Sequence, residues 1–179
     1  MKRIKKLLCI MTALCIIGIG PISVYAADPY GVCGSKTGKI SVKSYSSYND
    51  MWVSSIDNGI SAWNNSRANV TISVSSWSKN SIEVDRYNDE WYGLTTQTYN
   101  TSTGYTSKFV MQINARTISN DATDYRNFIK STVAHEFGHV FWLCDNPSTT
   151  SQSIMSYRRD REKTTEPTTF DINNVNAKY

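Results

Sequence analysis

The sequence predicts a mixed α/β fold, in which a twisted sheet of about five strands packs with two long helices. Short segments that alternate apolar and polar residues occur along the first two thirds of the chain and indicate strands. Two longer segments carry apolar residues at helical spacing, and a shorter segment of this kind closes the chain. The predicted order is therefore strand, helix, several strands, a second long helix and a C-terminal helix.

The first predicted strand covers residues 39–43, and a helix follows over residues 48–64. Ser47 and Asp50 have the spacing of a capping box at the start of this helix. Its apolar face, which we expect to pack in the core, consists of Trp52, Ile56, Ile60 and Trp63. Further strands are predicted by alternation or by β-prone composition at residues 70–74, 82–84, 92–99 and 108–114.

The strongest helical pattern extends from Asp121 to about Phe141, with Ser119 or Asp121 as its cap. Its apolar stripe consists of Tyr125, Ile129, Val133, Phe137 and Val140. Near the C-terminus, Thr168 and Asp171 have capping-box spacing and predict a last helix. The buried face of that helix would consist of Ile172, Val175 and Tyr179.

The charge of the chain is concentrated at its N-terminus. The 179 residues carry a formal charge of +4, but four of the 19 basic residues lie within the first six positions. Beyond them, 15 basic residues face 15 acidic ones, and the basic residues are scattered. Because proteins that bind nucleic acids or anionic membranes present a basic patch, we expect neither partner here.

The first 26 residues have the three parts of a secretory signal peptide. A basic stretch is followed by an apolar run from Leu7 to about Ile19, and small residues precede the expected cleavage site after Ala26. The apolar run is shorter than the roughly 20 residues that a membrane-spanning helix needs. We therefore expect a secreted monomer without membrane contact after cleavage, with residues 27–179 as its one domain.

The two histidines of the chain, His135 and His139, lie four residues apart within the strongest predicted helix. At this spacing their side chains project from the same face, and two such imidazoles can bind one Zn²⁺ at about 2.1 Å. Glu136 follows the first histidine, where it can act on a water molecule instead of binding the metal. An ordinary helix can contain this pattern by chance, but the predicted helix and the predicted export favour a metal site.

A catalytic zinc needs a third protein ligand and an open position. Asp145 lies six residues after His139. If the helix continued, Asp145 would lie about 120° around the axis from His139, so the chain must turn sharply after Val140 for Asp145 to reach the same metal. There are two alternatives: Cys144 is the third ligand, or the site has no third protein ligand.

The segment from His135 to Asp145 resembles the zinc-binding motif of the metzincin endopeptidases, His-Glu-x-x-His-x-x-Gly-x-x-His/Asp. The resemblance implies that Asp145 is the third ligand, in the aspartate form of the snapalysin-type secreted metzincins. Residues 153–157, Ser-Ile-Met-Ser-Tyr, resemble the methionine turn, which implies that Met155 packs beneath the zinc and that Tyr157 faces it. The order of elements is similar to that of the matrixin catalytic domain, which implies an α+β metzincin-like fold.

One residue departs from the family pattern, because Trp142 stands where the motif has its turn glycine. Glycine suits a helix end because it enters the left-handed region without a Cβ clash. A tryptophan in that conformation is strained by roughly 1–2 kcal/mol. Either this strain is present or the turn is built differently.

Cys33 and Cys144 are the two cysteines beyond the predicted signal peptide. Outside the cell such a pair tends to oxidise, so we expect a disulfide that joins the N-terminal segment to the end of the active-site helix. The alternative is that Cys33 blocks the zinc, as a propeptide cysteine does in matrixins, although the residues around it match that switch poorly.

Related families also bind Ca²⁺, but no spacing of acidic residues in this chain matches a calcium loop. Calcium therefore has no support from a motif. We expect solvated surface at the candidate acidic residues, which are Asp85, Asp89, Glu90, Asp121 and Asp124.

Together these features predict a secreted zinc endopeptidase that hydrolyses protein or peptide substrates. Glu136 would be the general base, and Tyr157 would help to stabilise the oxyanion. An extended substrate would pair with the predicted strand at residues 92–99. The alternatives are a secreted zinc-binding protein without peptidase activity, since Trp142 departs from the pattern, and a zinc hydrolase of a non-protein amide.

Overall fold

The computed structural model describes residues 28–179, so the predicted signal peptide lies outside the described part of the chain. No helix within residues 28–179 is both long enough and apolar enough to cross a membrane. The elements, in chain order, are β1 (Gly34–Ser35), β2 (Lys39–Val42), α1 (Asp50–Asn64), β3 (Thr71–Val74), β4 (Ser81–Asp85), β5 (Gly93–Tyr99), β6 (Tyr105–Asn114), α2 (Ala115–Asp121), α3 (Tyr125–Val140) and α4 (Thr169–Asn176). The predicted mixed α/β architecture is confirmed.

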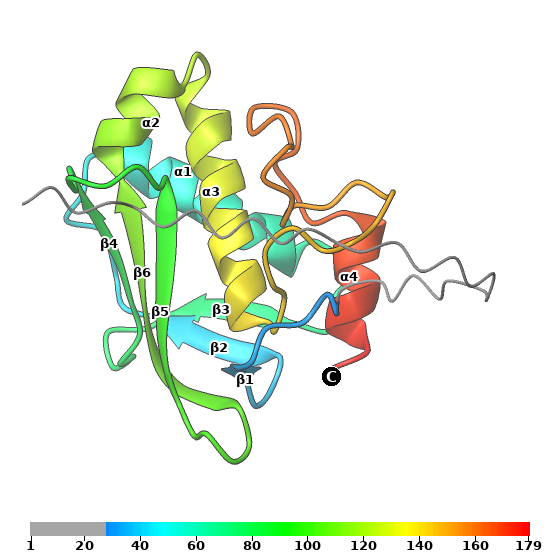
Figure 1. Cartoon of the computed structure of the whole chain (residues 1–179). Coiled ribbons are helices and arrows are strands. Elements are labelled where there is room, and N and C mark those ends of the chain that lie inside the picture. The colour runs from blue at the N-terminus through cyan, green and yellow to red at the C-terminus, as the bar shows by residue number, and fades with distance from the viewer. Residues whose placement is uncertain (1–27) are drawn as a thin grey trace, which may run out of the picture.

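The longest strand, β6, is the centre of a four-stranded sheet (Figure 1). β5 runs antiparallel along one edge of β6, while β4 and the short β1 run parallel along its other edge. β5 has no second partner strand within residues 28–179. It is therefore an edge strand, and one row of its backbone N–H and C=O groups is free to pair with another chain.

The sheet is not the single unit that the sequence predicts. β2 and β3 pair with each other in a separate parallel ladder, in register from Lys39 opposite Thr71 to Val42 opposite Val74. The two ladders meet where the Lys43 N–H donates to the Asn80 carbonyl at 2.8 Å, just before β4 begins. A local alternation pattern identifies strands but not their partners, which explains the difference.

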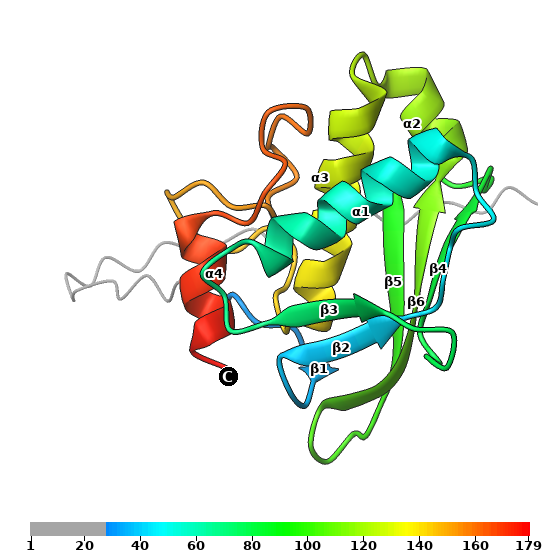
Figure 2. The ribbon, with the colours of Figure 1, turned by 180° about the vertical axis from the view of Figure 1, so that it is seen from behind.

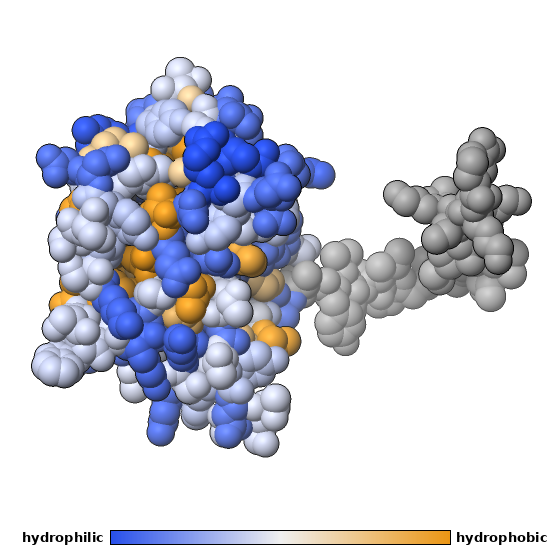
Figure 3. Space-filling model, turned by 90° about the vertical axis from the view of Figure 1, so that its left-hand side faces the viewer, coloured by the Kyte–Doolittle hydropathy of each residue, from blue (hydrophilic) through white to orange (hydrophobic). Residues whose placement is uncertain are grey.

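The long helices α1 and α3 lie on the same side of the sheet, as the two opposite views show (Figures 1 and 2). The other side of the sheet faces solvent, where hydrophilic side chains surround a few hydrophobic ones (Figure 3). Trp63 at the end of α1 is fully buried, and its Nε1–H donates to the Ala134 carbonyl of α3 at 2.8 Å. The predicted core role of Trp63 is confirmed, and it fixes α1 against the turn of α3 that precedes His135.

The helix caps differ from the predicted ones. Asn49, and not Ser47, caps α1, because its side chain accepts the Trp52 N–H. Asp124, and not Ser119 or Asp121, caps α3, so this helix begins at Tyr125, four residues later than the sequence predicts. The sequence does not predict the short helix α2, because its seven residues are too few to show a clear helical period.

Candidate metal centre

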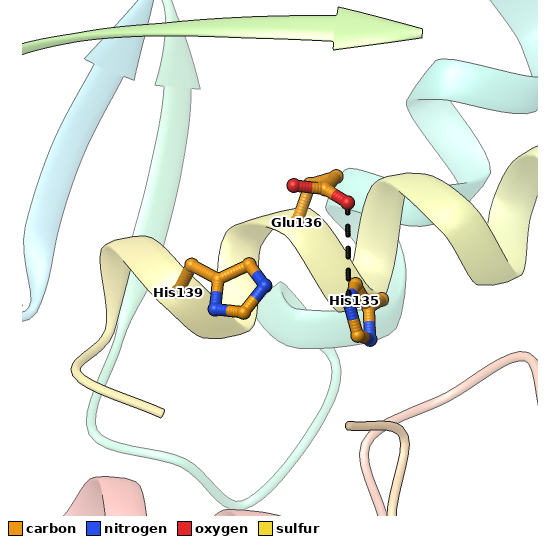
Figure 4. A group of neighbouring side chains, drawn as sticks. All are labelled: His135, Glu136 and His139. Atoms are coloured by element: carbon orange, nitrogen blue, oxygen red, sulfur yellow. Dashed lines mark ion pairs between the residues drawn. The ribbon is translucent and has the colours of Figure 1, made fainter. Parts of the chain in front are cut away.

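Helix α3 presents the two histidines on one side, one turn apart (Figure 4). Each imidazole uses its Nδ1 atom to bond a backbone carbonyl: His135 bonds Ile154 and His139 bonds Leu143, both at 3.0 Å. A carbonyl can only accept, so each Nδ1 carries the proton. The Nε2 atoms are thereby left with free lone pairs, as in metal-binding histidines.

The chain turns sharply directly after α3. Trp142 has a φ of 76°, and the Leu143 N–H reaches back to the Gly138 carbonyl at 2.9 Å. The turn thus has the left-handed geometry of a glycine position, although a tryptophan occupies it. This reversal carries Asp145 back beside the histidines, which a continued helix could not do.

The three candidate ligand atoms converge. Asp145 Oδ1 lies 3.1 Å from Nε2 of His135 and 3.5 Å from Nε2 of His139. Tetrahedral Zn²⁺ with bonds of about 2.1 Å separates its ligand atoms by about 3.4 Å, so these distances fit one zinc ion. Oδ1 is also buried and lacks a hydrogen-bond donor. An anionic oxygen that faces two nitrogen lone pairs requires a cation or a proton between them.

The charges around this triad act on one another. Burial alone would raise the pKa of Asp145, but His135 and His139 outweigh it and hold the pKa far below its usual range. Burial alone would lower the pKa of His139, but the Asp145 carboxylate and the Glu136 charge outweigh it and raise the pKa. In the metal-free protein a proton therefore competes for the position between His139 and Asp145.

Glu136 is buried beside the triad, with 3% of its surface exposed. Its Oε1 lies 3.9 Å from Nε2 of His135 (Figure 4), and its Oε2 has no hydrogen-bond partner. Glu136 and the two histidines also form a cluster within 4.8 Å. Asp145 nevertheless matches the ligand spacing better, because it lies close to both Nε2 atoms. A Cβ at Gly93 of β5 would overlap the Glu136 carboxylate, so the glycine leaves room for it.

Met155 lies directly beneath the histidine helix and is 1% exposed. A Cβ at Gly138 would overlap its sulfur atom, so the glycine between the two histidines allows this close contact. Asp171 of α4 holds the turn in place, since its carboxylate accepts the Ser153 hydroxyl and the Ile154 N–H. The capping box of α4 that the sequence predicts is present, but this second role of Asp171 depends on contacts that local spacing does not reveal.

Tyr157 lies at the rim of the site, with 54% of its surface exposed and its ring centroid 6.4 Å from that of His135. Partial burial and the nearby Asp145 carboxylate raise the pKa of Tyr157 to about 12. Its hydroxyl therefore keeps its proton at neutral pH and can donate it. The Tyr157 N–H donates to Oδ1 of Asn146 at 2.8 Å, which links this residue to the segment that carries Asp145.

The structure does not form the expected disulfide, and Cys33 and Cys144 are both free thiols. Tyr30 pairs antiparallel with Leu143, and the Cys144 N–H donates to the Pro29 carbonyl at 2.8 Å. Cys144 thus lies opposite Pro29, and Cys33 lies four residues further along the chain.

The candidate calcium ligands do not come together. Within residues 28–179 no cluster of metal-binding side chains forms away from His135 and His139. Several of the acidic residues have other partners: Asp124 caps α3, Asp121 accepts the Tyr92 hydroxyl at 2.7 Å, and Glu90 pairs with Arg116 at 3.2 Å.

The triad lies in a cleft of about 760 Å³ between β5 and α3. One end is lined by residues 31–33 and 143–145, and the other by Tyr92, Thr132, Arg159 and Arg161. Sequence reasoning did not assign the two arginines to the site, because they belong to a run in which acids and bases alternate. Only the folded chain places them in the cleft.

No family model matches this chain, and no curated protein does. Solved structures do resemble it. One is high choriolytic enzyme 1 from the medaka fish Oryzias latipes, a hatching enzyme zinc-protease, with 14% identity and a TM-score of 0.51 over 85% of this chain and 97% of that chain. Another is a chain of the GM1-bound ECX AB5 holotoxin, with 14% identity and a TM-score of 0.52 over 79% of this chain and 80% of that chain. These likenesses concern the fold, which is of the α+β metzincin-like kind.

Proposed function

We propose that this chain is a secreted zinc endopeptidase of the metzincin type, with His135, His139 and Asp145 as the metal ligands. One observation carries the proposal: the Nε2 atoms of both histidines and Oδ1 of Asp145 converge at the spacing of a tetrahedral zinc site. The buried carboxylate of Glu136, without a partner for Oε2, lies beside them. The resemblance of the fold to a zinc-protease supports the same reading.

Each residue has a distinct task in the proposed reaction. When bound, Zn²⁺ supplies Lewis acidity, which polarises a carbonyl group and makes water more acidic. Glu136 accepts a proton from the attacking water and delivers it to the leaving amine. The hydroxyl of Tyr157 donates a hydrogen bond to the carbonyl oxygen as negative charge develops on it. Met155 and the backbone carbonyls behind the imidazoles keep the ligands oriented.

The substrate pairs as an additional strand with the free edge of β5. β5 is held against the active-site helix, because Thr95 and Gln97 donate to the carbonyls of Glu136 and His139 at 3.3 and 3.1 Å. These side chains hold the strand at a constant distance from the triad. A peptide bound in extended form along this edge then passes over the Glu136 carboxylate.

A proteolysis assay tests the proposal. The zinc-loaded protein is expected to cleave casein or a mixed peptide library, and a chelator is expected to abolish the cleavage until zinc is added back. Glu136→Ala should retain zinc, as measured by elemental analysis, and lose cleavage by several orders of magnitude, because the general base is gone. Zinc binding with no cleavage of any peptide by the unaltered protein would contradict the proposal.

A further inference from the structure

The two arginines at one end of the cleft form a wall that the proposed reaction does not use. Arg159 donates through Nε to the Ser131 hydroxyl at 3.2 Å and through Nη1 to the Ser156 carbonyl at 2.9 Å. Arg161 stacks over the ring of Tyr92, with its guanidinium carbon 4.7 Å from the centroid. Both side chains line the cleft.

Among the described residues, neither guanidinium has an acidic partner within ion-pair distance, and Glu90, which also lines the cleft, pairs with Arg116 instead. The ion pairs formed within residues 28–179 include neither Arg159 nor Arg161, although other arginine and lysine residues do pair with carboxylates. Burial and the neighbouring charge of Arg161 lower the pKa of Arg159 to about 9, although the charges of Glu136, Asp145 and Asp171 act in the opposite direction, so Arg159 remains charged at neutral pH. Two adjacent cations in a partly buried wall repel each other and favour an anion between them.

The position of Arg159 alongside α3 indicates how far the two arginines lie from the bond that would be cleaved. Ser131, which Arg159 contacts, lies one helical turn before His135 on α3, a distance of about 6 Å along the helix axis. Successive residues of an extended peptide lie about 3.3 Å apart. The wall therefore faces the first or second residue away from the scissile bond, toward the start of β5.

We propose that Arg159 and Arg161 bind a carboxylate side chain of the substrate, so that the protein prefers an aspartate or glutamate next to the bond that it cleaves. A guanidinium binds a carboxylate through two parallel hydrogen bonds, which a neutral amide side chain cannot reproduce. A peptide that pairs antiparallel with β5 presents at this end the residues that follow the scissile bond. This inference rests on the proposed peptidase function, and it specifies the substrate class.

Matched peptides test the inference. Each pair consists of two peptides that differ only in carrying Asp or Asn, or Glu or Gln, at one position. The positions tested are the first and second on each side of the scissile bond, and kcat/KM is measured for both members of every pair. The acidic member is expected to be cleaved on the order of 10 to 100 times faster at one position, the range for hydrogen bonds between charged groups. Arg159→Gln should bring that ratio close to 1, and Arg161→Gln, which removes no backbone contact, should lower it severalfold.

Arg158→Gln is the matched control, because it removes the same charge from an exposed neighbour outside the cleft. It should leave the ratio unchanged. Binding of the acidic and neutral peptides to zinc-loaded Glu136→Ala, measured by fluorescence anisotropy, gives a second readout that needs no turnover. If no peptide is cleaved, the proposed function fails while the binding ratio still decides this inference. Equal cleavage and binding of both members of each pair, or an acid preference that Arg159→Gln and Arg161→Gln retain, would overturn it.

Discussion

Trp142 holds a backbone conformation that few residues other than glycine adopt. The surrounding structure compensates for the strain. The indole Nε1–H donates to the Ser35 carbonyl at 2.9 Å, and a Cβ at Gly34 would lie 2.5 Å from the ring, so the indole fits closely against β1. The Lys178 ammonium group lies over the indole ring of Trp142, 5.0 Å from its centroid. Trp142 thus ties the turn that precedes Asp145 to the N-terminal segment.

This balance predicts an unusual order of stability. Trp142→Ala loses the packing of the ring, about 3–5 kcal/mol, and retains a strained backbone. Trp142→Gly loses the same packing but relieves roughly 1–2 kcal/mol of strain, so it should be the more stable variant by about 1 kcal/mol. Urea unfolding of the three metal-free proteins measures these differences. An alanine variant clearly more stable than the glycine variant would show that the strain is absent.

The proposed zinc site should lose affinity for the metal when the charge of Asp145 is removed or when the pH falls. Asp145→Asn replaces a proposed anionic ligand with a neutral one that binds zinc poorly. Mutation of a residue that only hydrogen-bonds to a ligand typically lowers metal affinity tenfold to hundredfold, so Asp145→Asn should lower zinc affinity by more than that.

In the unaltered protein the raised pKa of His139 means that protons compete with zinc. Zinc affinity should therefore increase as pH rises from 5 to 8. Competition with a coloured chelator measures both effects, and an affinity unchanged in Asp145→Asn would remove Asp145 from the ligand set.

At the scale of elements, the turn at residues 153–157 and α3 pack as one unit. Their contact depends on Gly138, where a Cβ would overlap Met155, and on Asp171, which anchors the turn from α4. The histidine Nδ1 atoms add two further bonds between α3 and the loops that follow it. The candidate ligands are therefore oriented by three separate elements before any metal binds.

The close contact predicts a reversal of the usual effect of alanine in a helix. Gly→Ala in a helix interior normally stabilises by up to about 1 kcal/mol. Gly138→Ala should instead destabilise by about 1–3 kcal/mol, because the new methyl group meets Met155. In a Met155→Ala background the same change should become neutral or stabilising. Thermal unfolding of the four proteins of this cycle gives the coupling, and additive effects would mean that the two residues are not in contact.

At the scale of the whole molecule, the free thiols predict how the protein responds to reductant. Protein that consists of residues 27–179 should show two thiols after denaturation, and a reductant should leave its unfolding midpoint unchanged. A disulfide that closed a loop of this length would contribute on the order of 3–5 kcal/mol, which the reductant would remove. Denatured protein without thiols, together with a lower midpoint in reductant, would contradict the structure.

Much of the fold was predictable because its signals are local. The long helices and most strands follow from periodic patterns, and the capping box of α4 follows from the spacing of Thr168 and Asp171. The separation of β2 and β3 from the main sheet was not predictable, because strand partners are set by contacts between distant segments. The short helix α2 was not predictable, because its seven residues are too few to show a helical period.

The sequence alone determines that His135 and His139 share one face with Glu136 next to them, because helix geometry depends only on neighbouring residues. It also predicts that Asp145 can join them only through a sharp turn. The tertiary structure decides that Trp142 adopts that turn, that Cys33 and Cys144 stay apart, and that two arginines line the cleft. These features depend on contacts between segments that lie far apart in the chain, which local spacing does not encode.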